Sequence, residues 1–257
     1  MTFFTNDFLT LQLGKVEHTK YNITLYNVQV PALMSSQALI ALPAYNEEKV
    51  LGCVLQSLRH AGYTHIVVVD DGSTDATARI ARNYRVHIIS FPRNKGKGSA
   101  LRAAISYAIK KRYKALVTMD ADGQHNPLDI ASLLNGLQTH DVALGNRFAR
   151  HAYIPVYARA ANMLGNIVNA VFTGTWVSDS QCGLRAYTRA ALVKLRLHST
   201  HYEIDTEIIR ELKRKHISYT QIPVRVRYTA YSKSKRTKQS FLMGLETIAR
   251  LVTIYKK

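Results

Sequence analysis

The feature that most constrains this chain is an alternation, from Gln37 onward, of short apolar runs with longer segments of helical periodicity. Ala38–Leu42 and Thr64–Val69 have the length and aliphatic content of buried strands. Between them, Asn46–His60 repeats apolar residues every three or four positions, which predicts an amphipathic helix. Repeated strand–helix units pack as a mainly parallel sheet covered by helices. The sequence therefore predicts an α/β fold.

The same alternation continues along most of the chain. Further strands are predicted at Val86–Ile89, Ala115–Met119, Val142–Leu144 and Ile217–Tyr228. Further helices are predicted from a cap near Ser73 and Thr74, and over Gly98–Lys111, Pro127–Gln138, Val156–Phe172 and Ile204–His216. The segment around Asp179–Tyr187 has no assigned element.

The pattern divides the chain into one domain and two flanking segments. A chain of 257 residues suffices for one sizeable α/β domain, which we place at residues 37–235. Residues 1–36 lack the alternation and form an N-terminal extension to which we assign no role. Residues 236–257 are expected to form a basic amphipathic helix, with the apolar residues of Gln239–Tyr255 along one stripe.

The chain has a large excess of positive charge, with 35 Lys and Arg against 17 Asp and Glu and a net charge of +18. Such an excess favours an anionic partner: a nucleic acid, an acidic membrane surface or a phosphorylated substrate. A basic nucleic-acid-binding protein would account for the charge alone. It would leave the acidic clusters described next unexplained, because carboxylates in a cleft repel a phosphodiester backbone. We therefore expect no nucleic-acid partner.

Polar and acidic residues follow three of the predicted strands, at Pro43–Glu48, Asp70–Asp75 and Asp120–His125. In an open α/β sheet, ligands bind in the crevice outside the carboxyl ends of the strands. The three segments are therefore expected to converge on one cleft.

Asp120 and Asp122 are the most informative pair in that cleft. Residues two apart on an extended segment point to the same side, and two such carboxylates repel unless a cation lies between them. A divalent ion is typically held by one or two carboxylates plus substrate phosphates. The pair therefore predicts a divalent cation, Mg²⁺ or Mn²⁺, that binds a nucleotide diphosphate. The alternative is a polar turn that caps the next helix.

Two further segments have both a structural and a ligand-binding interpretation. Asp70 and Asp71 either form a turn that opens the next helix or accept hydrogen bonds from a base or ribose. Asn94–Gly98 opens a predicted helix, so its backbone N–H groups and Lys97 are placed to face a phosphate.

Taken in order, these motifs resemble glycosyltransferase family 2, and most closely its dolichyl- or polyprenyl-phosphate sugar transferase branch, which includes dolichol-phosphate mannosyltransferases. The matching segments between Ala38 and Tyr187 are PAYNEE, VVVDDGSTD, NKGKGSAL, MDADGQHNP, LGNRF and SDSQCGLRAY. A weaker match continues through YEIDTEII and IPVRVRYTAYSKSK to about Lys235. The resemblance implies the GT-A fold, with a Rossmann-like, mostly parallel central sheet.

The resemblance also implies a role for each matching residue on the donor side. Nucleotide-sugar contacts fall to Pro43, Tyr45, Glu47, Asp70, Asp71, Lys97 and Asp120. Metal ligands fall to Asp122, with Asp120 on the metal or the ribose and Gln124 as a possible third ligand.

On the acceptor side, the resemblance implies phosphate binding by Arg147 and Arg159. Arg147 lies in LGNRF, where Asn146 replaces the usual Ser of the branch, and Arg159 lies in RAAN, which resembles an Arg-Gly-Ala-Asn segment. A guanidinium can bind a phosphate bidentately. Each arginine could instead serve a structural ion pair. Gln181 and Arg185 are the other implied acceptor contacts.

The position of Asp179 in SDSQCG is that of a general base in transferases that attack with a hydroxyl. A phosphate monoester has a second pKa of about 6, so it is largely ionised at neutral pH. We therefore expect Asp179 to orient Arg185 or the acceptor, and its loss to cost less activity than the loss of Asp122.

The implied activity is an inverting transfer of a sugar from UDP or GDP to a polyprenyl or dolichyl phosphate. The alternative is a family 2 transferase that acts on a glycan or sugar hydroxyl.

No apolar run approaches the roughly 18 residues that cross a bilayer, and the N-terminus lacks the pattern of a signal peptide. We expect a cytoplasmic protein that touches the cytoplasmic membrane face peripherally. The basic stretch Arg225–Lys238 and the helix Gln239–Tyr255 would bind lipid, or that helix would pack on the core or on a partner subunit.

Overall fold

The computed structural model describes residues 37–149 and 156–227. Its strands form one sheet in the order β3-β2-β1-β4-β6-β5-β7. The strands are β1 (Ala38–Ala44), β2 (Ile66–Asp70), β3 (His87–Ser90), β4 (Ala115–Thr118), β5 (Val142–Asn146), β6 (Arg185–Thr188) and β7 (Tyr219–Pro223). The helices are α2 (Leu51–His60), α3 (Thr77–Asn83), α4 (Lys97–Lys110), α5 (Asp129–Gly136), α6 (Val156–Thr173), α7 (Arg189–Lys194) and α8 (Ile204–Arg214).

The sheet is mainly parallel, as the alternation predicts. β1 pairs in parallel with β2 and with β4, β2 with β3, and β5 with β7. Strand β6 is the exception, because it runs antiparallel between β4 and β5. It lies in the segment to which the sequence assigned no element. The α/β fold is confirmed.

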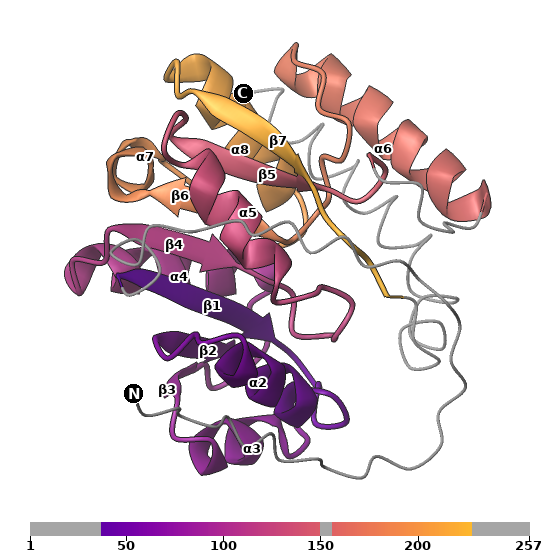
Figure 1. Ribbon diagram of the computed structural model, residues 1–257. Coiled ribbons are helices and arrows are strands. Elements are labelled where there is room, and N and C mark those ends of the chain that lie inside the picture. Colours follow the sequence, from indigo (N-terminus) through magenta and orange to yellow (C-terminus); the bar gives the residue numbers. More distant parts are fainter. Residues whose placement is uncertain (1–36, 150–155, 228–257) are drawn as a thin grey trace, which may run out of the picture.

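Helices cover both faces of the sheet (Figure 1). Because side chains alternate along a strand, Ile40 and Leu42 of β1 join one core cluster with α2 and α5. Leu39 and Ala41 of the same strand point the other way, into a second cluster with α4, α7 and α8. Strand β1 is therefore buried on both faces, which explains its unbroken apolar run.

Two helices begin later than the sequence predicts. α2 starts at Leu51 rather than Asn46, because Asn46 has a positive φ of 53° and cannot continue a right-handed helix. α3 starts at Thr77 after Ala76, whose side chain makes no cap hydrogen bond, and the preceding Asp75 accepts the Thr77 N–H on its Oδ1 at 2.9 Å. The predicted cap near Ser73 and Thr74 is therefore wrong.

Within residues 37–149 and 156–227, no helix has the length and apolar content to cross a membrane. The predicted N-terminal extension (1–36) and C-terminal helix (236–257) lie outside the described residues. So does most of the basic stretch that precedes that helix.

Candidate active site

The loops that follow β1 and β2 are joined by hydrogen bonds at the carboxyl end of the sheet. Asn46 donates its N–H to Ser73 Oγ at 3.0 Å, and its Oδ1 accepts the Thr74 N–H at 2.9 Å. Glu47, which is 8% exposed, donates its N–H to Thr77 Oγ1 at 2.8 Å. The residues that precede α2 are therefore fixed against the loop that follows β2.

Asp71 connects β2 to the beginning of α4. Its two carboxylate oxygens accept the N–H groups of Lys95 at 2.7 Å and Gly96 at 2.8 Å. Gly96 has a φ of 91°, and a Cβ there would collide with the carbonyl of Thr200, so this turn requires glycine. Burial raises the pKa of Asp71, although both hydrogen bonds act in the opposite direction. Asp70 holds its own turn, with Oδ1 accepting the Ser73 N–H at 3.0 Å.

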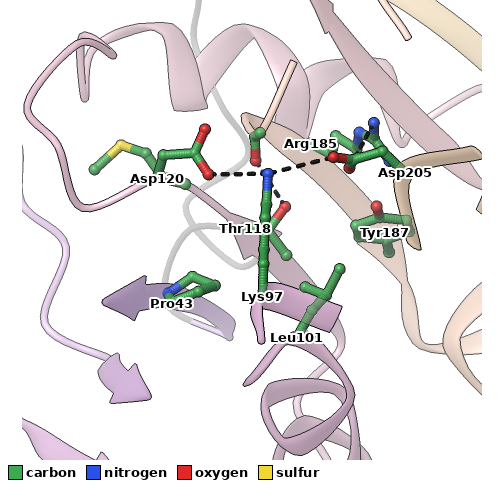
Figure 2. Close-up of a pocket in the computed structure, with 10 residues that line it drawn as sticks. Pro43, Lys97, Leu101, Thr118, Asp120, Arg185, Tyr187 and Asp205 are labelled. Atoms are coloured by element: carbon green, nitrogen blue, oxygen red, sulfur yellow. Dashed lines mark hydrogen bonds and ion pairs between the residues drawn. The ribbon is translucent and has the colours of Figure 1, made fainter. Parts of the chain in front are cut away.

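Lys97 lies between two carboxylates at the centre of the site. Its Nζ is 3.3 Å from Asp120 Oδ1 and 3.4 Å from Asp205 Oδ2, and Figure 2 shows the amine reaching up between them. Burial disfavours the charged form, but the two carboxylates outweigh it and raise the pKa of Lys97. A small cavity surrounds this ion pair, lined by Pro43, Lys97, Leu101, Thr118, Met119, Asp120, Gly183, Arg185, Tyr187 and Asp205.

The predicted carboxylate pair is present at the end of β4. Burial acts against the ionised form of Asp120, yet Lys97 and His125, whose Nε2 is 3.6 Å away, hold its pKa below the usual range. Burial and the neighbouring charge of Asp120 raise the pKa of Asp122. Asp122 Oδ1 accepts the Gln124 N–H at 3.0 Å. The two carboxylates are thus close enough to repel, and Lys97 neutralises only part of their charge.

The donor set around this pair is small. Among the described residues, no group of three or more His, Cys, Asp and Glu side chains clusters as a complete metal site. Asp120, Asp122 and the nearly buried Gln124 offer oxygen ligands. A magnesium-like ion needs only one or two carboxylates when substrate phosphates complete its shell. The residues therefore fit a divalent cation that binds together with a diphosphate.

Arg147 and Asp179 form a bidentate ion pair. Asp179 Oδ2 accepts Nε of Arg147 at 2.7 Å and its backbone N–H at 3.0 Å, and Oδ1 accepts Nη2 at 2.7 Å. Asp179 is 1% exposed. Burial alone would lower the pKa of Arg147, but Asp179 raises it. Of the two predicted roles of Asp179, orienting Arg185 is wrong, because its carboxylate holds Arg147; orienting the acceptor stays a prediction.

Arg185 is a buried residue that lines the pocket. It is 2% exposed, and it donates Nη2 to Ser180 O at 2.6 Å and Nε to Cys182 O at 2.8 Å. Its Nη2 is also 3.0 Å from Asp205 Oδ1. Among residues 37–149 and 156–227, its Nη1 makes no hydrogen bond. The hydroxyl of Tyr187, which lines the same pocket, makes none either, so two buried polar groups there remain for a ligand.

The other predicted residues are spread around this centre. Pro43 lines the pocket, and Tyr45, two residues further on, is 41% exposed. Gln181 is exposed and lies against Gly165 of α6. Arg159 is exposed on the same helix, so it does not share the buried environment of Arg147.

Two important residues were missed in the sequence. Asp205, at the start of α8, pairs with both Lys97 and Arg185. Gly183 lies so close to Asp120 that a Cβ there would collide with its carboxylate. Asp205 belongs to the weakly matching YEIDTEII, and Gly183 to SDSQCGLRAY. These two motifs were the only signs in the sequence that Asp205 and Gly183 belong to the site.

The chain matches the family model described as "Glycosyl transferase family 2" over residues 39–196. It is 34% identical over 233 residues to an uncharacterised protein of Methanocaldococcus jannaschii, covering 88% of this chain and 95% of the relative. It is 29% identical over 239 residues to a UDP-N-acetylglucosamine–dolichyl-phosphate N-acetylglucosaminyltransferase of Methanococcus voltae, covering 84% and 94%. A polyprenol monophosphomannose synthase of Mycolicibacterium smegmatis is 31% identical over 174 residues, covering 63% and 66%.

Solved structures share the fold. Glucosyl-3-phosphoglycerate synthase of Mycobacterium tuberculosis in complex with UDP matches with a TM-score of 0.63 at 21% identity, covering 86% of this chain and 82% of that chain. The same enzyme with Mn²⁺, UDP and phosphoglyceric acid matches with a TM-score of 0.60 at 18% identity, covering 84% and 81%. The chain has the GT-A fold and belongs to glycosyltransferase family 2, with relatives named as dolichyl- and polyprenyl-phosphate sugar transferases.

Proposed function

We propose that this glycosyltransferase moves a sugar from a UDP- or GDP-linked donor to a polyprenyl or dolichyl phosphate at the cytoplasmic face of a membrane, with inversion at the anomeric carbon. The proposal rests mainly on one observation. A partly buried carboxylate pair suited to a diphosphate lies close enough to affect Arg147, a partly buried arginine suited to a phosphate. The domain at 37–235 would contain both.

The donor would bind along the loops after β1, β2 and β4. Pro43, Tyr45 and Glu47 would form the base and ribose pocket. Asp71 would act mainly through the turn it already fixes, because both of its oxygens accept backbone N–H groups there. Asp70 would support the same pocket. Lys97 lies beside the proposed diphosphate site and would add a positive charge near it.

Asp120, Asp122 and Gln124 would hold the divalent cation. When bound, such an ion supplies charge stabilisation to a departing diphosphate. Asp122 is suited to this role because burial and Asp120 destabilise its charge in the metal-free protein. A bound cation would relieve that repulsion.

The acceptor phosphate would be held by Arg147, with Arg159 and Gln181 nearer the entrance. An oxygen of the already ionised phosphate would attack the anomeric carbon, and the bond from that carbon to the diphosphate oxygen would break. No proton has to leave the nucleophile, so the main task of the protein is alignment. The Asp179 carboxylate meets this need by fixing Arg147 through three hydrogen bonds. Arg185 would position Asp205, which also pairs with Lys97.

The relatives support this substrate class. The names of the Methanococcus voltae and Mycolicibacterium smegmatis proteins specify a dolichyl phosphate and a polyprenol phosphate product. A dolichyl-phosphate beta-glucosyltransferase of Homo sapiens is 28% identical over 207 residues. Their sugars differ, so these names support the acceptor more than the donor.

A donor screen would test the proposal. Radiolabelled UDP- and GDP-sugars would be offered with polyprenyl phosphate, with and without Mg²⁺ or Mn²⁺, and lipid-phase label would be counted. We expect transfer from one donor class, only with metal, and slower by about 100-fold or more in an Asp122→Asn variant. Transfer to glycan hydroxyls and not to the lipid phosphate would instead support the alternative acceptor class.

A further inference from the structure

The turns that lead from helices into strands form a basic surface at the amino ends of the parallel strands. The proposed active site lies at the other end, toward which the arrowheads of β1 and β4 point in Figure 1. We call this surface the amino-end face. It comprises residues 59–65 before β2, 81–86 before β3, 110–114 before β4 and 213–218 before β7.

The amino-end face carries much positive charge and little negative charge. Its four turns contain, in the same order, one, two, four and three Lys or Arg residues, and no Asp or Glu. All of these cations except the half-buried Lys215 are exposed. Two acids adjoin the face, and both have partners: Asp141 accepts the Ser218 hydroxyl at 2.9 Å, and Glu211 pairs with Arg214 at 2.6 Å. A large share of the net charge of +18 therefore lies at one end of the sheet.

Three of these turns hold a basic residue in a backbone conformation that favours glycine. Arg85, Arg112 and His216 have positive φ angles of 50°, 59° and 49°. Each directly follows the end of a helix, where glycine is the usual left-handed residue, and Gly62 fills the same position before β2 with a φ of 86°. Elsewhere among the described residues, positive φ occurs only at glycines and Asn46. The two arginines are therefore present at a cost to the backbone, which indicates a role for their side chains.

Cations near the end of a helix also have a structural role, because they oppose the partial negative charge of its last carbonyl groups. α2, α3, α4 and α8 each have a basic residue in their last turn. Arg85, Arg112 and Lys114 lie beyond those last turns. The two roles predict different outcomes: a helix-stabilising arginine lowers stability when it is replaced by glycine, whereas a docking arginine at a left-handed position does not.

The length and chemistry of the amino-end face suit an extended acidic segment of a protein. The sheet has seven strands, which at a spacing of about 4.8 Å give this edge a length of about 29 Å. An extended chain of about nine residues crosses that distance. α7 begins against the face, because Arg189 donates its N–H to Lys114 O at 2.8 Å. Val193 on α7 is 60% exposed and offers an apolar contact to a peptide.

Other anionic partners fit this surface less well. Single-stranded nucleic acids stack their bases on exposed aromatic rings, and the exposed Tyr and Trp side chains of the described residues, Tyr45, Trp176 and Tyr202, lie outside the amino-end face. A bilayer at this face would be separated from the proposed active site by the length of β1, seven residues or about 23 Å. Nine further Lys and Arg residues follow Pro223 in the sequence and remain for an anionic membrane.

We propose that the amino-end face binds an acidic segment of a partner protein, while the opposite end of the sheet stays open to donor and acceptor. The cations of the four turns would pair with successive carboxylates of the extended segment. The proposal does not depend on the substrates of the enzyme, because it concerns a surface outside the active site.

Binding of a fluorescein-labelled ten-residue oligoglutamate to the full chain, followed by fluorescence anisotropy, tests the proposal. Arg85→Gly/Arg112→Gly removes two charges and relieves two left-handed residues. We expect its affinity for the peptide to fall by about fivefold to tenfold, with a Tm equal to or above that of wild type. Arg85→Lys/Arg112→Lys keeps the charge and should bind as wild type does. The matched control is Lys49→Gln/Arg79→Gln, which removes two exposed cations before α2 and in the first turn of α3, and its affinity should stay within about twofold of wild type.

Several outcomes would overturn the proposal. If wild type does not bind the peptide, or the control pair weakens binding as much as the glycine pair, the face is not a docking site. A lower Tm of the glycine variant with unchanged peptide binding would assign both arginines to the helix ends. Stronger binding of wild type to a ten-nucleotide oligouridylate than to oligoglutamate, weakened by the glycine pair, would replace the protein partner by a nucleic acid. Loss of binding to phosphatidylglycerol-containing vesicles, with peptide binding unchanged, would replace it by a membrane.

Discussion

Asp179 illustrates how a carboxylate can serve a transferase without moving a proton. Its two oxygens are occupied by the guanidinium and backbone of Arg147, and it is almost fully buried. A charge-assisted, bidentate pair restricts the arginine to one orientation. The sequence indicated that Asp179 positions another group. It could not indicate which arginine, because that depends on how the loop after β5 meets the loop after α6.

The ordering of two aspartate variants tests this role. Asp179→Asn should raise the KM for the acceptor by about 10-fold to 100-fold through misplacement of Arg147, with a smaller effect on kcat. Asp122→Asn should lower kcat by about 100-fold or more through loss of charge stabilisation. Steady-state kinetics with the acceptor varied would measure both. Asp141→Asn, at the beginning of β5, is a control for charge loss. A larger kcat loss in Asp179→Asn than in Asp122→Asn would refute the ordering.

Lys97 gives a pH prediction. In the wild type, burial acts to raise the pKa of Asp120, but Lys97 and His125 hold it low, so Asp120 stays ionised well into acid. In Lys97→Met, burial would no longer be offset by that ammonium, and the pKa of Asp120 would rise. A carboxyl whose pKa is lower in the folded than in the unfolded protein stabilises the fold above the unfolded pKa, and this stabilisation is lost as the pH falls through the folded pKa. As the pH is lowered, Lys97→Met should therefore lose stability and activity at a higher pH than wild type does. Thermal unfolding and kcat/KM between pH 4 and 8 would show this, and superimposable acid limbs would contradict it.

At the scale of elements, the sequence predicted the parallel half of the sheet well and the second half less well. Strands β1, β2 and β4 are continuous apolar runs because both of their faces are buried. Strand β6 could not be recognised in this way. It is four residues long and begins with Arg185, whose charge is satisfied only by Asp205 and two carbonyls from distant or irregular segments. The role of Asp205 could not be predicted for the same reason, because its partners Lys97 and Arg185 are distant in the sequence.

The approach to β6 provides a prediction about backbone packing. In Gly183→Ala, the new Cβ would meet the Asp120 carboxylate and displace it from Lys97. The donor KM should rise by about tenfold, and thermal stability should also fall, because the Lys97 ammonium loses one of its two carboxylate partners. Gly52→Ala on α2 is the matched control, since its Cβ would meet only ordinary contacts with Tyr84 and Ile80. An unchanged donor KM would show that the position of Asp120 is not limiting.

At the scale of the whole molecule, the fold gathers the residues that the linear motifs could only list. The loops after the parallel strands β1, β2 and β4 supply the carboxylates. The loops after β5 and α6 supply Arg147 and the Asp179 that holds it. The net charge of +18 is not explained by the residues of the proposed active site. It acts over a distance set by the ionic strength, about 10 Å at 0.1 M salt. If the protein acts at a membrane as proposed, the consequence of this charge should appear in how it binds that membrane rather than in how it aligns a bound substrate.

Salt provides the final test of that distinction. Raising the NaCl concentration from about 0.05 to 0.5 M shortens the screening distance about threefold, so attraction to an anionic bilayer should weaken. We expect kcat/KM for polyprenyl phosphate in phosphatidylglycerol-containing vesicles to fall by about tenfold or more. With a short-chain isoprenyl phosphate in solution, the fall should be several times smaller, because the buried Arg147 and its partner Asp179 are poorly screened. Pure phosphatidylcholine vesicles are the control. Equal falls for all three acceptor forms would mean that the positive charge acts on the substrate phosphates and not on the membrane.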